Sequence, residues 1–103
     1  MSRTHPTGEL ILEMLRAHEP ELLAAGICHL SLFGSAARGE DDRESDIDLA
    51  AELDPDAQIG LFELAALERR LSTLLGRSVD LLPEPVEKRR LQASIDRDRR
   101  RAF

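Results

Sequence analysis

The first block of the chain has the hydrophobic pattern of a helix. Apolar residues at three- and four-residue spacing predict one helix after Thr7, a residue type that caps helices; the stripe consists of Leu10, Ile11, Met14 and Leu15. Pro20 interrupts this pattern, so we expect a second short helical turn over residues 21–25 that ends at Gly26.

Three short apolar segments predict strands. Residues 27–33 are mostly apolar and lie between glycines, which is typical of a buried strand. Residues 45–53 alternate between an apolar face and a face that carries two carboxylates, and Asp54-Pro55 ends this second strand. Residues 79–82 form a third strand, ended by prolines.

Helical spacing is strongest over residues 59–75, where Gly76 provides the stop. We expect its buried stripe to contain Phe62, Ala66, Leu67, Leu71, Leu74 and Leu75. A last helix is expected over residues 86–95. The order α-β-β-α-β-α predicts an α/β (α+β) fold in which helices flank one small mixed sheet, and 103 residues are enough for a single domain, 1–103.

Charge divides the chain into an acidic body and a basic end. Residues 1–87 carry a net charge of −11 and residues 88–103 a net charge of +5, with no Tyr or Trp anywhere. An acidic body without these aromatic rings disfavours direct nucleic-acid binding. The basic end has two interpretations: a solvated, partly self-neutralising segment, or a segment that docks on an acidic partner or on the chain's own acidic surface. We expect the run Arg97–Arg101 to lie in solvent.

The lone cysteine, the histidine beside it and the lack of a long apolar stretch indicate in which compartment the protein works. Cys28 is the only cysteine and lies in an apolar run, so we expect a buried, inert thiol, and His29 beside it a structural histidine. No secretory signal is visible, and no apolar stretch approaches the ~20 residues that span a bilayer. We therefore expect a cytoplasmic protein without membrane contact.

Two carboxylates form the first candidate site. Asp46 and Asp48 are two residues apart in a predicted strand, so they project from the same face. Like charges held this close favour a divalent cation between them, and Mg²⁺ prefers carboxylates together with phosphate oxygens. The alternative is an ordinary solvent-facing strand, which an Asp-x-Asp pair alone favours.

The turn at Gly34-Ser35 favours the metal site over an ordinary solvent-facing strand. It follows the first strand directly, where glycine allows close approach of a phosphate, serine adds a hydroxyl, and a starting helix offers free N–H groups. Asp80 adds a third carboxylate on the next predicted strand, where it could bind a second metal ion and accept a proton from an attacking hydroxyl. Its alternative interpretation is an exposed edge carboxylate.

Three segments together resemble the minimal nucleotidyltransferase (MNT) family of the polymerase-beta-like superfamily. They read LFGSAARGE at 32–40, SDIDL at 45–49 and VDL at 79–81. The resemblance covers most of the chain. It implies a polymerase-beta-like fold, ATP or another triphosphate as donor, and two Mg²⁺ ions.

The resemblance also implies roles for single residues and for a partner. Gly34 and Ser35 would hold the triphosphate, the three aspartates would bind metal, and Asp80 would also activate the acceptor. Arg38 would either pair with phosphate or brace the loop against Glu40 or Asp46.

The family further implies an HEPN-type toxin as partner in a hetero-oligomer, silenced by AMP on a tyrosine hydroxyl. The chain would thus be a Mg²⁺-dependent nucleotidyltransferase that moves a nucleoside monophosphate, expected to be AMP, to a protein hydroxyl. The alternative is an antitoxin that neutralises its partner by binding and occlusion, without catalysis.

Overall fold

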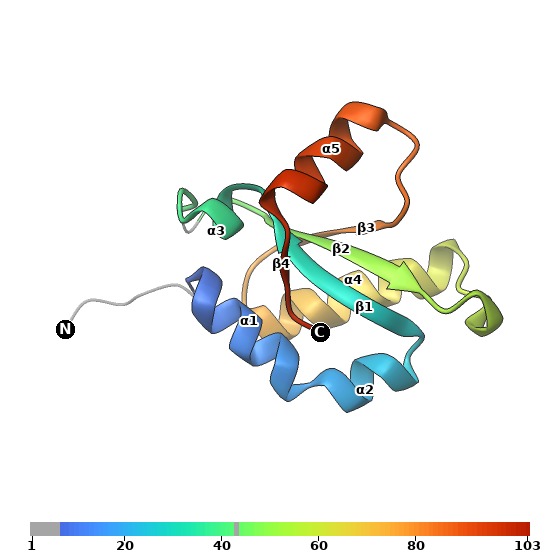
Figure 1. Ribbon diagram of the computed structural model, residues 1–103. Coiled ribbons are helices and arrows are strands. Elements are labelled where there is room, and N and C mark those ends of the chain that lie inside the picture. The colour runs from blue at the N-terminus through green and yellow to red at the C-terminus, as the bar shows by residue number, and fades with distance from the viewer. Residues whose placement is uncertain (1–6, 43) are drawn as a thin grey trace.

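The fold is built on one mixed sheet with the strand order β3-β2-β1-β4 (Figure 1). The computed structural model describes residues 7–42 and 44–103. The strands are β1 (Ile27–Phe33), β2 (Ile47–Leu53), β3 (Val79–Pro83) and β4 (Arg100–Arg101). β1 pairs antiparallel with both β2 and β4, whereas β2 and β3 run parallel. The predicted α+β class with a small mixed sheet is therefore confirmed.

Helices cover both faces of this sheet (Figure 1). They are α1 (Gly8–Ala17), α2 (Glu19–Ala24), α3 (Gly34–Arg38), α4 (Leu61–Leu75) and α5 (Arg89–Asp98), with a 3₁₀ turn η1 (Pro55–Ala57). Leucines of α1, α2 and α4 pack with alternate residues of the three long strands in the main core. On the other face, Phe33, Ala50 and Ile95 form a smaller cluster beneath α5. The sheet therefore has a thick apolar side and a thinner side that α5 covers.

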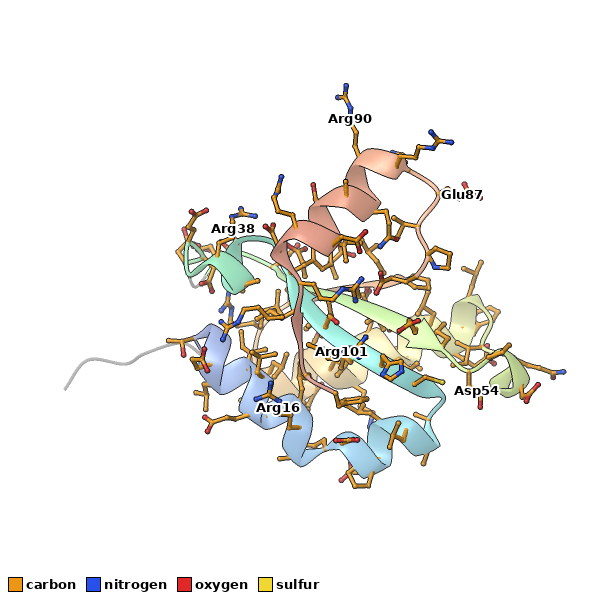
Figure 2. The ribbon with its side chains drawn as sticks, viewed as in Figure 1. Arg16, Arg38, Asp54, Glu87, Arg90 and Arg101 are labelled. Atoms are coloured by element: carbon orange, nitrogen blue, oxygen red, sulfur yellow. The ribbon has the colours of Figure 1, made fainter. Side chains whose placement is uncertain are left out.

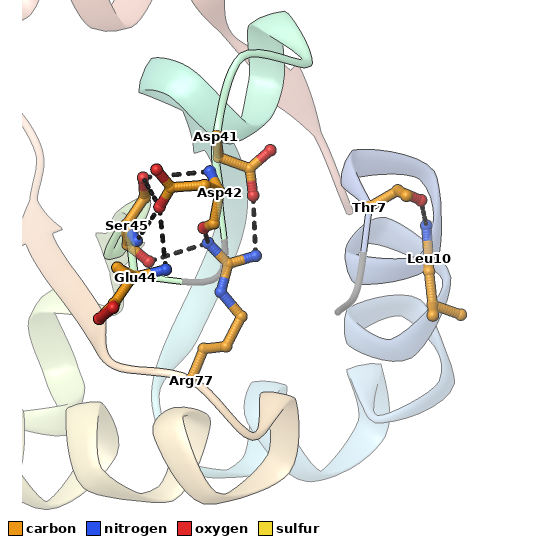
Figure 3. A network of polar contacts seen from close by, with 7 residues as sticks. All are labelled: Thr7, Leu10, Asp41, Asp42, Glu44, Ser45 and Arg77. Atoms are coloured by element: carbon orange, nitrogen blue, oxygen red, sulfur yellow. Dashed lines mark hydrogen bonds and ion pairs between the residues drawn. The ribbon is translucent and has the colours of Figure 1, made fainter. Parts of the chain in front are cut away.

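The residues that were expected to cap or end helices lie at helix ends in the structure. The hydroxyl of Thr7 accepts a hydrogen bond from Leu10 N at 3.4 Å and caps α1 (Figure 3). The Glu63 carboxylate accepts from Gly60 N at 2.9 Å at the start of α4, and Gly76 ends that helix with φ 71°. Pro20 lies in the first turn of α2, so this helix starts two residues earlier than predicted.

Several boundaries differ from prediction. β2 begins at Ile47 rather than at residue 45, so Asp46 lies in the loop just before the strand. α4 begins at Leu61 rather than at residue 59. α5 lies three residues later than the predicted 86–95, because residues 84–88 form the turn between β3 and the helix, which begins at Arg89.

The predicted buried stripe of α4 was wrong at its start. Phe62 is 89% exposed and Ala66 is also exposed, whereas Leu67 and Leu71 are buried. A helix turns by about 100° per residue, so the stripe through Leu67 extends back to Leu64, three residues earlier, and not to Phe62.

The prediction of a buried Cys28 was also wrong. The pairing of β1 with β2 shifts between Ile27 and His29, where Cys28 is the extra residue of a bulge. The bulge breaks the alternation of faces, so Cys28 and His29 are both exposed. His29 lies in the strand as predicted, but on the surface.

The backbone of the basic end packs against the fold although the side chains of Arg97 and Arg101 are exposed, so the expectation that 97–101 lies in solvent is corrected in part. β4 pairs with β1, and the Arg16 guanidinium donates to the carbonyls of Arg101 and Ala102 at 2.9 and 2.8 Å. Figure 2 shows Arg16 and Arg101 beside one another. Arg99 binds both carboxylate oxygens of Glu84. Of the two interpretations of this end, docking on the chain's own surface describes these contacts.

Within residues 7–42 and 44–103, no helix has the length and apolar character needed to cross a bilayer.

Candidate active site

Asp48 and Asp80 lie side by side on neighbouring strands. They occupy the same register position of the parallel pair β2–β3. Residues two positions further along, Ala50 and Leu82, belong to the cluster beneath α5. Since residues two apart share a face of a strand, both carboxylates project from the α5 face of the sheet. The expectation that Asp80 lies beside the Asp-x-Asp pair agrees with this geometry. β3 is also an edge strand and Asp80 is exposed, so the edge position and the shared site coexist.

The turn that begins at Gly34 lies beside the Asp48 carboxylate. Phe33 pairs with Asp48 across β1 and β2, so the next residue, Gly34, begins α3 directly beside Asp48. A β-carbon on Gly34 would lie 2.3 Å from Oδ2 of Asp48, and its φ is +75°. Only glycine combines that backbone conformation with that close approach. The turn and the carboxylates therefore form one site.

Ser35 lies at the start of the same short helix. It is half-buried, and its carbonyl accepts a hydrogen bond from Glu40 N at 2.9 Å, which closes the turn. The residue that precedes the helix, Phe33, offers no side-chain cap to the first-turn N–H groups. Ser35 is therefore placed beside backbone donors that an anion could accept.

The carboxylates of this site repel one another. Burial, followed by the charges of Asp80 and Asp46, raises the pKa of Asp48 above its ordinary value of 3.8. Burial, followed by the charges of Glu68 and Asp46, likewise raises the pKa of Asp80. The positive charge of Arg38 works in the opposite direction on the pKa of Asp48. A net excess of negative charge remains, which a bound cation would relieve.

The donor set fits a hard divalent cation that brings other ligands with it. Among the described residues, no group of three or more His, Cys, Asp or Glu side chains is placed so that it could hold a metal ion by itself. Oxygen ligands supplied from one side only are typical of Mg²⁺, which usually binds one or two carboxylates and completes its sphere with phosphate oxygens and water. Asp48 and Asp80, in register on neighbouring strands, and Asp46, whose charge acts on both, are the carboxylates that could supply one or two ligands to such an ion.

Arg38 braces its turn. Its Nε donates to Glu40 at 2.9 Å and its Nη1 to Asp98 at 2.6 Å. Asp98 lies at the end of α5 and its side chain is only 6% exposed. The bracing role is therefore observed, through Glu40 and Asp98 and not through Asp46. These two bonds use Nε and Nη1, so a phosphate contact would have to use the remaining donors of the guanidinium or replace one of these partners.

Two residues near the carboxylates were not found from the sequence. Glu68 of α4 accepts a hydrogen bond from Leu81 N at 2.9 Å, beside Asp80. Arg77, just before β3, holds the loop that leads to Asp46 (Figure 3). Both are charged residues next to apolar elements, but their partners are distant in sequence and no local pattern indicates them.

Comparison with known proteins agrees with this geometry. The profile of the nucleotidyltransferase domain family matches residues 16–103. The chain belongs to this nucleotidyltransferase family. A curated relative, the protein adenylyltransferase MntA of Thermococcus cleftensis, is 36% identical over 77 residues, which are 74% of this chain and 76% of the relative.

Solved structures share the fold. A candidate minimal nucleotidyltransferase superposes with a TM-score of 0.67 and 33% identity, over 86% of this chain and 93% of that chain. The fold also matches the complex of a tri-AMPylated HEPN toxin with an MNT antitoxin from Shewanella oneidensis, with a TM-score of 0.64, 18% identity, and coverage of 89% and 71%. The family assignment rests on the profile and on the more similar relatives, and the last match shows the fold alone.

Proposed function

We propose that this nucleotidyltransferase moves AMP from ATP, with Mg²⁺, to a hydroxyl group of a partner protein. The partner would be an HEPN-type toxin that the modification silences, in a hetero-oligomer within the cytoplasm, where ATP is available. Support comes from the names of the relatives: one is a protein adenylyltransferase, and a protein of the same fold is an antitoxin bound to an AMPylated HEPN toxin.

One observation carries the proposal. Asp48 and Asp80 lie in register on parallel strands, and Gly34 leaves room for the Asp48 carboxylate at the start of α3. This arrangement puts a helix start without a side-chain cap next to the carboxylates on one face of the sheet. A triphosphate held by the turn would bring its oxygens to those carboxylates, which is the geometry that metal-assisted phosphoryl chemistry needs.

Each residue then has a task. Asp46 and Asp48 would hold the metal-bound triphosphate, with Gly34 and Ser35 close to its phosphates. Bound Mg²⁺ supplies charge neutralisation on the phosphates and lowers the pKa of the acceptor hydroxyl. Asp80 would take the hydroxyl proton as the acceptor oxygen attacks the α-phosphorus. The bond between the α-phosphorus and the oxygen that bridges the α- and β-phosphates breaks, and pyrophosphate leaves with that electron pair.

The test is transfer of label to the partner. We expect the wild-type chain, co-expressed with an HEPN-type partner, to add AMP to it, as seen by intact mass and by label from α-³²P-ATP. Asp46→Asn with Asp48→Asn removes the metal-binding charges and should abolish both signals. Glu52→Gln is a matched control, because Glu52 is an exposed carboxylate at the other end of β2.

Two outcomes would contradict the proposal. Labelling by the double aspartate variant would remove the assigned site. A partner that is neutralised without any gain in mass, and equally by the wild type and the double variant, would establish the occlusion alternative instead.

A further inference from the structure

Asp46 differs from the other two carboxylates in what holds it. Asp48 and Asp80 lie within paired strands, so the hydrogen bonds of the sheet fix their backbone. Asp46 precedes β2 and belongs to no strand. Its position therefore depends on the contacts of the residues on either side of it.

Both flanking residues are tied to the same dipeptide, Arg77-Ser78. On one side, Ile47 N donates to the Ser78 carbonyl at 2.9 Å. On the other side, the Ser45 carbonyl accepts from Arg77 Nη2 at 2.8 Å. Asp46 thus lies between two tethers that end on consecutive residues, just before β3.

Arg77 also holds the start of this loop (Figure 3). Its Nη1 donates to the Asp41 carboxylate at 2.8 Å, and its Nη2 donates to the Asp42 carbonyl at 2.9 Å. The side chains of Arg77 and Asp41 are only 5% and 7% exposed. A buried guanidinium presents several donors in a fixed plane, and no other side chain reproduces that pattern.

The loop has its own internal bonds. The Asp42 carboxylate accepts from the backbone N–H groups of Glu44 and Ser45 at 2.9 and 3.0 Å, and from the Ser45 hydroxyl at 3.1 Å. These bonds hold Glu44 and Ser45 to Asp42. Arg77 donates to the carbonyls of both Asp42 and Ser45, so a shift of the arginine would move both residues.

We propose that Arg77 is a positioning residue that sets the Asp46 carboxylate for the metal-bound nucleotide. The inference rests on the proposed function, because it assigns Asp46 to that site. The inference extends the proposed function by naming a side chain just before β3, Arg77, that fixes the loop before β2 to which Asp46 belongs. Arg77 touches neither substrate nor metal; it acts through the backbone of Ser45.

The test is a double-mutant cycle on Mg²⁺-dependent binding of a non-hydrolysable ATP analogue, without any partner protein. Arg77→Lys keeps the charge opposite Asp41 but loses the planar fork that reaches two carbonyls. We expect it to raise the Mg²⁺ concentration for half-maximal nucleotide binding about tenfold, the size typical of losing a residue that orients a metal ligand. In an Asp46→Asn background, the same substitution should add less than a twofold change, because the carboxylate to be positioned is gone. Arg69→Lys, on the exposed side of α4, is the control and should change nothing.

A general loss of structure would give a different result. If Arg77→Lys weakened binding equally in the wild-type and Asp46→Asn backgrounds, Arg77 would be merely structural and the inference would be wrong. Unchanged Mg²⁺ dependence in folded Arg77→Lys would overturn it as well. If that variant did not fold, Asp41→Asn would replace it, since it retains an oxygen acceptor but weakens the ion pair; a shift of at least threefold would support the inference and no shift would overturn it.

The two proposals fail in different ways. If the wild-type chain showed no Mg²⁺-dependent nucleotide binding at all, the proposed function would fall, and this inference with it. If the wild-type chain bound nucleotide normally and the cycle was additive, only the role of Arg77 would fall.

Discussion

Gly34 and Asp48 lie so close that a β-carbon on the glycine would stand 2.3 Å from Oδ2 of the aspartate. Real side-chain atoms do not approach so closely, so one of the two residues would have to move if residue 34 had a side chain. The Gly34-Ser35 turn and strand β2 are therefore coupled, because residue 34 has no side chain.

We expect Gly34→Ala to abolish transfer, to below about 1% of wild type, because a displacement of about 1 Å in a catalytic group costs roughly 100-fold in rate. The substitution should also reduce the free energy of unfolding by about 2–3 kcal/mol, since it combines a clash with a φ of +75°. AMP transfer and urea unfolding are the measurements.

Gly39 offers a matched control for the backbone strain. Its φ is +73°, and a β-carbon there would meet nothing within 4 Å. Gly39→Ala should thus lose only about 1 kcal/mol of stability and keep most of its activity. Equal loss of activity in the two variants would show that strain in the turn, and not the contact with Asp48, limits the enzyme.

Repulsion in the site predicts that Asp48 costs stability in the absence of metal. The pKa of Asp48 is raised on folding, so between 3.8 and the raised value the folded state binds more protons than the unfolded state. The free energy of unfolding then falls as the pH rises through that window. At pH 7 without Mg²⁺, Asp48→Asn should therefore unfold on the order of 2–4 °C above wild type. The gain should disappear below pH about 3.8, where the wild-type carboxyl is protonated as well.

Mg²⁺ and nucleotide should reverse the order of the two melting temperatures, of the wild type and of Asp48→Asn. Ligands that bind only the folded state raise its melting temperature. We expect Mg²⁺ with an ATP analogue to stabilise the wild-type chain and not Asp48→Asn, which reverses their order. Glu52→Gln, remote on the same strand, should follow the wild type in both conditions. A wild-type chain that Mg²⁺ and nucleotide leave unchanged would count against a metal site at Asp48.

Substitution of Asp80 should slow the transfer step and leave nucleotide binding nearly unchanged. If it accepts the proton of the acceptor hydroxyl, Asp80→Asn should lower kcat by about 100-fold or more, while the KM for ATP changes less than about threefold. Steady-state kinetics with the partner protein would measure both constants. A large rise in the KM for ATP with little change in kcat would assign Asp80 to the donor metal instead.

The sequence predicted the parts of this fold that local patterns specify. The strand at 27–33 has the predicted bounds, because an apolar run between glycines leaves few alternatives. Gly76 ends α4 as predicted, since its positive φ of 71° favours glycine. The order of motifs also indicated which strands carry carboxylates, and Asp48 and Asp80 are indeed neighbours.

Features that depend on distant contacts were missed. β4 consists of two arginines, which have no strand pattern, and it exists because β1 and the Arg16 side chain bind its backbone. The bulge at Cys28 depends on the register of β2, which no local signal gives. The partner of Arg38 at the end of α5, Asp98, is 60 residues away in the sequence. In each case the deciding hydrogen bonds join segments that only the folded chain brings together.

Arg99, at the end of α5, holds this helix on the sheet through Glu84 and Ser31. Arg99 donates to both carboxylate oxygens of Glu84, at 2.9 and 2.6 Å, and to the buried Ser31 hydroxyl at 3.0 Å. The side chains of Arg99 and Glu84 are 23% and 8% exposed, so water screens this pair only in part. Arg99→Ala should therefore lower the free energy of unfolding at pH 7 by about 1–3 kcal/mol, which a chemical denaturation curve would measure.

The pH dependence of this loss identifies its cause. Hydrogen bonding from Arg99 is the main reason that the pKa of Glu84 lies below its ordinary value of 4.5. A carboxyl with a lowered pKa in the folded state stabilises the protein above its unfolded pKa, and this contribution is lost as the pH falls through the lowered value. The difference between wild type and Arg99→Ala should thus be full at pH 7 and shrink steadily below pH 4.5. Arg97→Ala is the control, because Arg97 is 69% exposed and its contact with Asp98 should contribute little to the free energy of unfolding at any pH. A deficit in Arg99→Ala that stayed constant down to pH 2 would mean that packing of the arginine stem, and not its bond to Glu84, holds α5 in place.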